Sequence, residues 1–156
     1  MFYKLHHYLS VIAAVLVIIL TGCDEQTVYH TYLPVPILGW EKHDTLVFRT
    51  DTIEQEADYQ FALEVRSTER YPFQSVWLIV ERRFDPTQDF HRDTVECRLL
   101  NPTTHRMGEG IYTYQYTFPL PPLHLPGAKP GEIRVRHYMH RETLSGLHDI
   151  GIHIMR

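Results

Sequence analysis

The sequence YQFALEVR, residues 59–66, decides the fold class of this chain. Every second residue from Tyr59 to Val65 is aromatic or aliphatic, and the residues between them are mostly polar. A period of two is typical of a β-strand with one buried face and one solvent-exposed face. We therefore expect a half-buried strand at this position.

Segments with the same period recur along the chain, and no window of ten or more residues after residue 22 shows a convincing helical period. About seven strands at this spacing predict an all-β fold, a single antiparallel β-sandwich, with a barrel as the second choice. The other predicted strands are residues 46–48, 76–80, 94–100, 112–118, 133–139 and 150–154.

Turn signals separate these segments: Tyr71-Pro72, Asp85-Pro86, Asn101-Pro102, Gly108-Glu109-Gly110 and Pro130-Gly131. The region from Pro119 to Pro130 contains five prolines. Because proline lacks a backbone N–H, we expect a long, stiff loop outside the regular ladders. A crossover between sheets is the favoured role of this loop, and a docking site is the alternative.

The N-terminal region carries a targeting signal. The apolar run Leu9–Leu20 is too short to cross a bilayer as a helix, and Lys4 precedes it. Leu20-Thr21-Gly22-Cys23 has the form of a bacterial lipobox. We expect residues 1–22 to be a lipoprotein signal peptide, cleaved between Gly22 and Cys23, with Cys23 carrying the lipid. An ordinary signal peptide followed by a cysteine is the alternative.

Residues 23–43 show little periodicity and are predicted to be the lipidated N-terminus and a tether, with the β-sandwich domain at residues 44–156. The acyl chains on Cys23 would hold the domain at a membrane surface. Cys97 is the only other cysteine, so no disulfide forms within the mature chain. Its alternation with Val95 and Leu99 favours a small buried hydrophobic residue over a reactive thiol.

Composition and motifs give no support for catalysis or for nucleic-acid binding. The formal net charge is −4, which excludes the basic excess that attracts nucleic acid. G-x-S-x-G, H-E-x-x-H and P-loop motifs are all missing from the sequence. Carboxylates near residues 51–58 and 85–93 lack the spacing of a calcium loop and are interpreted as solvated charge. We expect neither an enzyme nor a cofactor.

The histidines invite a metal hypothesis, which the spacing argues against. His137 and His140 are three apart on a predicted strand, and His148 and His153 are five apart. Odd spacing in a strand sends two side chains to opposite faces, so neither pair binds one ion. We therefore expect no metal site.

An aromatic stripe, a tryptophan and a glycine each yield a packing prediction. The stripe at Tyr112, Tyr114, Tyr116 and Phe118 is interpreted as core rather than as a sugar-binding platform. The strand at 76–80 is apolar on both faces, which predicts a central strand with a covered, structural Trp77. Gly151 lies within the last predicted strand, where we expect a close approach of another backbone.

The mature chain resembles the GldH family of gliding-motility lipoproteins of the Bacteroidota. The order and spacing of several short features carry the resemblance from Cys23 to the C-terminus. These are Cys23-Asp24, Val28-Tyr29-His30, Trp40, Tyr71-Pro72-Phe73, Trp77-Leu78, Asp93-Thr94 with Cys97 and Leu99, Gly108-x-Gly110, and the run from Leu144 to Gly151.

The resemblance implies an acylated cell-envelope protein that supports gliding, a process linked to the type IX secretion machinery, without enzymatic activity or cofactor. Attachment to the outer membrane and protein partners in the envelope are the expected consequences. The alternative is a glycan-binding lipoprotein that uses exposed aromatics such as Trp40, Trp77 or Tyr138. The candidate partner surface consists of Tyr71, Pro72, Phe73, Pro121, Pro122 and Leu123.

Overall fold

The computed structural model describes residues 26–100 and 107–156, so Gly22, Cys23 and the Asn101-Pro102 turn lie outside the described residues. The described residues contain ten strands and no helix. The strands are β1 (Thr27–Pro34), β2 (Trp40–Glu41), β3 (Leu46–Ile53), β4 (Ala57–Thr68), β5 (Ser75–Arg83), β6 (His91–Arg98), β7 (Thr113–Leu125), β8 (Lys129–His137), β9 (Thr143–Leu144) and β10 (Leu147–Met155).

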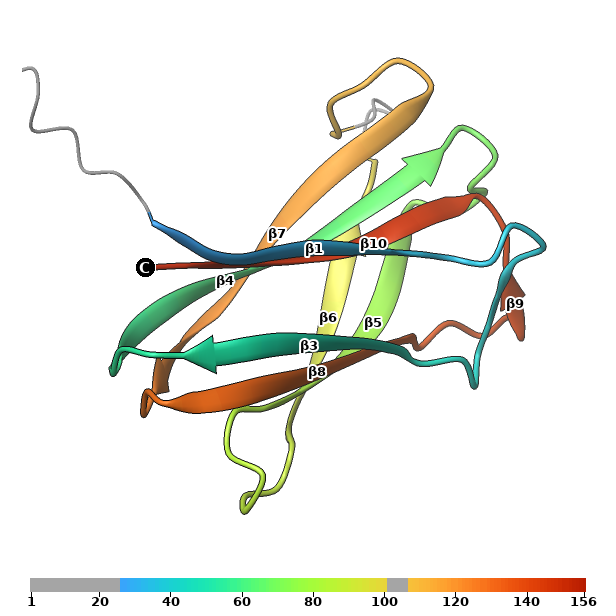
Figure 1. The fold of residues 1–156 in the computed structure, drawn as a ribbon. Coiled ribbons are helices and arrows are strands. Elements are labelled where there is room, and N and C mark those ends of the chain that lie inside the picture. The colour runs from blue at the N-terminus through green and yellow to red at the C-terminus, as the bar shows by residue number, and fades with distance from the viewer. Residues whose placement is uncertain (1–25, 101–106) are drawn as a thin grey trace, which may run out of the picture.

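Two four-stranded antiparallel sheets form the fold, with strand orders β1-β10-β4-β7 and β3-β8-β5-β6 (Figure 1). The short pair β2-β9 lies at the end of the sandwich where β1 finishes. The all-β antiparallel prediction is confirmed. Each of the seven predicted strands overlaps an observed one, namely β3, β4, β5, β6, β7, β8 and β10.

Strand β4 packs at the centre of the first sheet, between β10 and β7. Phe61, Leu63 and Val65 are buried in the core, as their period predicts. The other face of β4 is only partly exposed to solvent: Gln60 is exposed, as expected, whereas Ala62 and Glu64 are buried. A buried glutamate on the outer face of a sheet needs an explanation, and its neighbours are described below.

The prediction that residues 23–43 form a tether is wrong for residues 27–34, which form the edge strand β1. β1 pairs with β10 from Thr27↔Met155 to Pro34↔Asp149. Its signal in the sequence is weak because an edge strand is only half-buried, so polar residues are tolerated on both of its faces. The sandwich therefore includes both the region near Thr27 and the C-terminal strand.

The prediction that Pro119–Pro130 lies outside the ladders is also wrong. β7 continues to Leu125, and β8 starts at Lys129. Prolines are accommodated because β7 is an edge strand, where an N–H that would face solvent is not needed. The register shifts where Pro121 and Pro122 lie between the paired residues Leu120 and Leu123, which marks a β-bulge.

Cys97 is buried, as predicted, and burial raises the pKa of its thiol to about 12. In the tyrosine stripe, Tyr116 is buried, while Tyr114 and Phe118 pack partly buried against the core. Tyr112 is exposed because it precedes β7. The core interpretation is therefore confirmed for three of the four residues.

Candidate functional site

The corner at residues 71–73 is held in place by its tyrosine. The Tyr71 side chain is buried, its hydroxyl donates a hydrogen bond to the Ser75 carbonyl oxygen at 3.1 Å, and its ring packs edge-on against Phe73. Burial raises the pKa of Tyr71. Tyr71 is thus a structural residue, whereas Pro72 is exposed and Phe73 is half-buried. Only the latter two are available to a partner.

The C-terminal run from Leu144 to Gly151 contacts this corner through a glycine. Gly146 has a φ of 90°, and a Cβ atom at this position would lie 2.4 Å from the Tyr71 backbone nitrogen. The Thr68 N–H donates to the Gly146 carbonyl oxygen at 2.8 Å. Only glycine fits such an approach without displacement of the backbone.

A groove of about 610 Å³ lies beside the corner, between the ends of β1 and β4 and the β9–β10 turn. We call it the distal groove, and its lining includes Pro34, Ile37, Arg70, Ser145 and His148. Ile37 and the neighbouring Leu38 are among the most exposed hydrophobic side chains of the described residues. Exposed aliphatic side chains on a loop do not stabilise the fold, and their grouping beside a groove is typical of a contact surface.

The second predicted contact segment lies at the opposite end of the sandwich. Thr27 pairs with Met155, which pairs with Gln60, and the adjacent Tyr59 pairs with Leu123. Pro121, Pro122 and Leu123 therefore lie toward the Thr27 end of the first sheet, which we call the proximal end. The distal groove begins at Pro34, about 25 Å away along β1. The structure does not bring the two predicted segments together.

Of the three aromatic residues predicted for a glycan site, one is buried and two are exposed. Trp40 is fully buried, and its indole N–H donates to the Asp44 carbonyl oxygen at 3.0 Å. Trp77 is 39% exposed and Tyr138 is 59% exposed, and the Tyr138 N–H donates to the Trp77 carbonyl oxygen at 2.7 Å. β5 is a central strand, as predicted. The expectation of a covered Trp77 is wrong, because the outer face of β5 is open to solvent at Trp77, next to the exposed Tyr138.

The histidine pairs considered in the sequence do not converge. His137 is buried and donates from Nε2 to the Trp40 carbonyl oxygen at 3.1 Å, while His140 is exposed. His148 contacts Asp149 at 2.7 Å, away from His153. Desolvation by burial lowers the pKa of His137.

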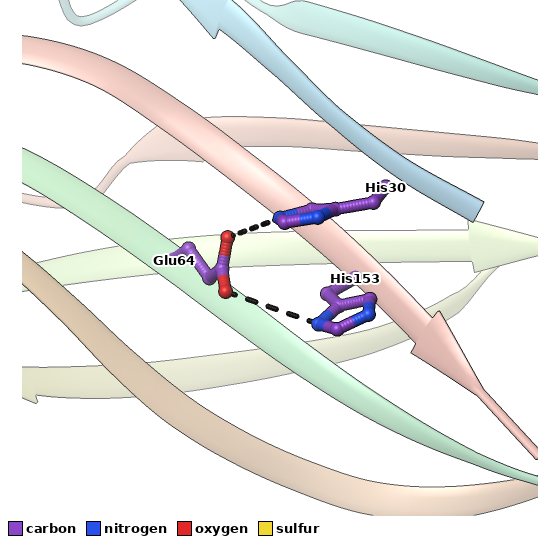
Figure 2. Close-up of side chains that lie close together, drawn as sticks. All are labelled: His30, Glu64 and His153. Carbon is purple, nitrogen blue, oxygen red and sulfur yellow. Dashed lines mark hydrogen bonds and ion pairs between the residues drawn. The ribbon is translucent and has the colours of Figure 1, made fainter. Parts of the chain in front are cut away.

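A different set of side chains converges on the outer face of the first sheet. His30 of β1, Glu64 of β4 and His153 of β10 place their potential ligand atoms within 4.8 Å of one another (Figure 2). His30 Nε2 lies 2.8 Å from Glu64 Oε2, and His153 Nδ1 lies 4.0 Å from Glu64 Oε1. Sequence spacing alone does not reveal this cluster, because its members lie on three strands distant in the sequence.

The cluster is explained by strand register. His30 pairs directly with His153, and Glu64 pairs with Gly151, two residues before His153 on β10, so all three side chains lie on the same face of the sheet. Because Gly151 has no side chain, the Tyr32 ring and the Glu64 side chain come together above it. The close neighbour expected at Gly151 is thus a tyrosine ring rather than another backbone.

No helix that could span a membrane occurs in the described ranges, 26–100 and 107–156. The lipidation site Cys23 lies outside these ranges.

The fold and the groove define the class of this protein as an all-β sandwich domain with an open groove beside exposed aliphatic residues. The model of the GldH lipoprotein family matches residues 27–154, and the chain belongs to this family. The match begins at the first residue of β1 and ends one residue before the last residue of β10.

Two curated relatives are similar to this chain. The gliding motility lipoprotein GldH of Flavobacterium johnsoniae is 29% identical over 94 residues, which are 60% of this chain and 58% of the relative. The GldH homolog of Christiangramia forsetii is 28% identical over 95 residues, 61% of this chain and 57% of the relative. The alignments thus span less than three fifths of the length of either relative.

Among solved structures, a family GH115 4-O-methyl-α-glucuronidase aligns with this chain at a TM-score of 0.39 and 12% identity. The alignment covers 85% of this chain and 18% of the glucuronidase. Likeness at this level carries no argument about function.

Proposed function

We propose that this protein is a lipid-anchored cell-envelope lipoprotein that acts as a non-enzymatic accessory component of the gliding-motility and type IX secretion machinery. The single observation that carries the proposal is the family match over residues 27–154. In the proposal, acyl chains on Cys23 hold the protein at the outer membrane, and an envelope protein contacts the distal groove.

The position of β1 in the sequence, shortly after Cys23, supports this arrangement. β1 begins only four residues after Cys23, so lipidation at Cys23 would keep the proximal end close to the membrane. The distal groove then points away from the membrane, toward other envelope proteins. Its exposed Ile37 and Leu38 and the exposed Pro72 supply apolar contact area.

The test is photocrosslinking in the native envelope. A photoreactive amino acid replaces Leu38 or Pro72, which lie beside the distal groove, or the exposed Tyr138, which follows β8 of the second sheet and serves as the control. We expect crosslinks to motility or secretion proteins from the distal positions only, and their loss in a Cys23→Ala background. The proposal fails if neither distal position crosslinks to a protein and deletion of the gene leaves gliding and secretion intact.

Binding to glycans is a second candidate function, favoured by the exposed aromatic pair Trp77 and Tyr138. Glu96 pairs across the strands with Trp77 and supplies a carboxylate beside the rings. A carbohydrate that stacks on Trp77 should change the tryptophan fluorescence, and Trp77→Ala should abolish the change, because the buried Trp40 does not contact ligand. A screen of envelope glycans without such a change would exclude this function.

A further inference from the structure

We propose that His30, Glu64 and His153 form a binding site for a divalent transition-metal ion, with Zn²⁺ as the best-fitting ion. The three side chains supply two imidazole nitrogens and one carboxylate. This donor set is found in zinc sites that leave one coordination position to water. The site is independent of the proposed role in motility.

The geometry requires only small side-chain rotations. Zinc binds histidine nitrogen and carboxylate oxygen at about 2.0–2.2 Å, so ligand atoms of one site lie roughly 3–3.5 Å apart. The observed separations of 2.8 Å for His30 and 4.0 Å for His153 from the two oxygens of Glu64 bracket this range. The two imidazole rings are stacked, with centroids 4.2 Å apart, and both face the carboxylate (Figure 2).

The charge of Glu64 supplies the driving force. Only 4% of this residue is exposed, and a buried carboxylate is costly unless a cation lies beside it. In the described part of the chain, only the two histidines form ion pairs with Glu64. They neutralise it only when they are protonated, whereas a divalent ion does so with both imidazoles neutral.

Arg66, two residues after Glu64 on β4, contacts other partners. Both Nε and an Nη of Arg66 donate to Gln115 Oε1 at 3.0 Å, and its other Nη lies 3.7 Å from Asp149. The Arg66 guanidinium also stacks over the Tyr32 ring at 3.7 Å. Among the described residues Arg66 forms its ion pair with Asp149 and none with Glu64.

The surroundings orient the proposed ligands. Thr27 Oγ1 lies 3.0 Å from His153 Nε2, which leaves Nδ1 directed toward Glu64. Such an outer contact to the second ring nitrogen is typical of metal-bound histidines. The Tyr32 hydroxyl is buried beside Glu64 and forms no hydrogen bond of normal geometry. The pKa of Tyr32 is raised to about 12, first by burial and second by the Glu64 carboxylate.

Binding would tie three strands together. β1 is an edge strand that pairs only with β10 within its sheet, and the ion would add a link from β1 to β4. A ligand that binds only the folded state raises the free energy of unfolding with the logarithm of its concentration relative to its Kd, and so raises the unfolding temperature. The expected consequence is a β1 that stays in the sheet when force acts through the N-terminus.

The test uses the untagged full chain purified in detergent, stripped with chelator and titrated with Zn²⁺ by calorimetry. We expect one ion per chain, a rise of several degrees in the unfolding temperature, and no such rise with Mg²⁺. Co²⁺ in place of zinc should give visible absorption bands of a four-coordinate site. His30→Gln and His153→Gln should each weaken Zn²⁺ binding at least tenfold.

His124→Gln is the matched control, because His124 also lies between two carboxylates, Asp58 at 2.8 Å and Glu56 at 3.3 Å, on the exposed surface. It should leave the zinc affinity unchanged. The proposal is overturned if the stripped wild-type chain binds no stoichiometric zinc, or if His30→Gln and His153→Gln bind it as the wild type does. Circular dichroism checks that each variant folds, and His30, which is partly exposed, is the safer of the two substitutions.

Discussion

Gly151 shows how one missing side chain shapes the outer face of the first sheet. A Cβ atom at this position would lie 2.6 Å from a ring carbon of Tyr32 and 3.1 Å from Glu64 Cβ. Gly151→Val should therefore lower the free energy of unfolding by about 1–3 kcal/mol, since overpacking displaces neighbours. Urea unfolding measures the change. Thr117→Val, at the exposed β7 position opposite Glu64, is the control and should be nearly neutral.

His137 makes stability depend on pH through its neutral ring. Nε2 donates to the Trp40 carbonyl oxygen, and Nδ1 accepts from the Met139 N–H at 3.4 Å, so a proton on Nδ1 would remove an acceptor. Burial lowers the pKa of His137 below its ordinary value of 6.5 in the folded state. The unfolded chain therefore binds the proton first, and stability is lost as the pH falls below about 6.5.

His137→Gln tests this account, because glutamine retains one donor and one acceptor. We expect the variant to lose less stability than the wild type between pH 6.5 and 5 in urea unfolding. Hydrogen bonds to Asp58 and Glu56 raise the pKa of His124, so its contribution has the opposite sign and is lost as the pH rises. That contribution is common to both proteins and cancels in the comparison. Parallel pH curves would contradict the assignment to His137.

Strand β7 protects an open sheet edge with proline. Its outer side pairs with no strand in the described residues, and Pro121 and Pro122 form a bulge on it. An open edge without proline invites pairing with another chain. Pro121→Val combined with Pro122→Thr restores backbone donors, and we expect concentration-dependent association on size exclusion with light scattering. A variant that stays monomeric at the same concentrations would show that the prolines do not block the edge.

The strands that the sequence predicts are those with a strong period of two. β3, β4, β5, β6, β7, β8 and β10 bury a regular apolar face, so the pattern of each survives in the sequence. β1 is missed because it is an edge strand with Thr31 on its inner face, and the extent of β7 is missed because prolines are tolerated at an edge. A strand with a regular apolar face is visible in the sequence even at a sheet edge, as β3, β6 and β7 show, whereas β1 lacks such a face.

The candidate sites were less predictable than the strands. Tyr71 and Trp40 proved to be core residues, since burial depends on packing that no local pattern encodes. The cluster of His30, Glu64 and His153 arises from the register of three strands, which the sequence does not state. The only local signal for the cluster was His30, and it was not recognised because residues 23–43 were expected to be a tether rather than a strand.

The anchoring point controls how the molecule faces the membrane. Four Cα steps separate Cys23 from Thr27 and span at most about 14 Å. If Cys23 is lipidated, the proximal end must stay near the headgroups, while the distal groove stands a strand length farther away. Gln60 marks the proximal end, because it pairs with Met155, which also pairs with Thr27. Leu38 marks the distal end.

A single thiol at either marker measures this orientation, because Cys97 is buried with a raised pKa and does not react. A fluorophore on Gln60→Cys should be quenched by nitroxide lipids in reconstituted vesicles, and the same fluorophore on Leu38→Cys should not. A ten-residue Gly/Ser spacer between Gln26 and Thr27 should remove the difference by freeing the domain from the surface. Equal quenching at both markers without the spacer would mean that the lipid does not orient the sandwich, and the distal groove would then lose its privileged access to partners.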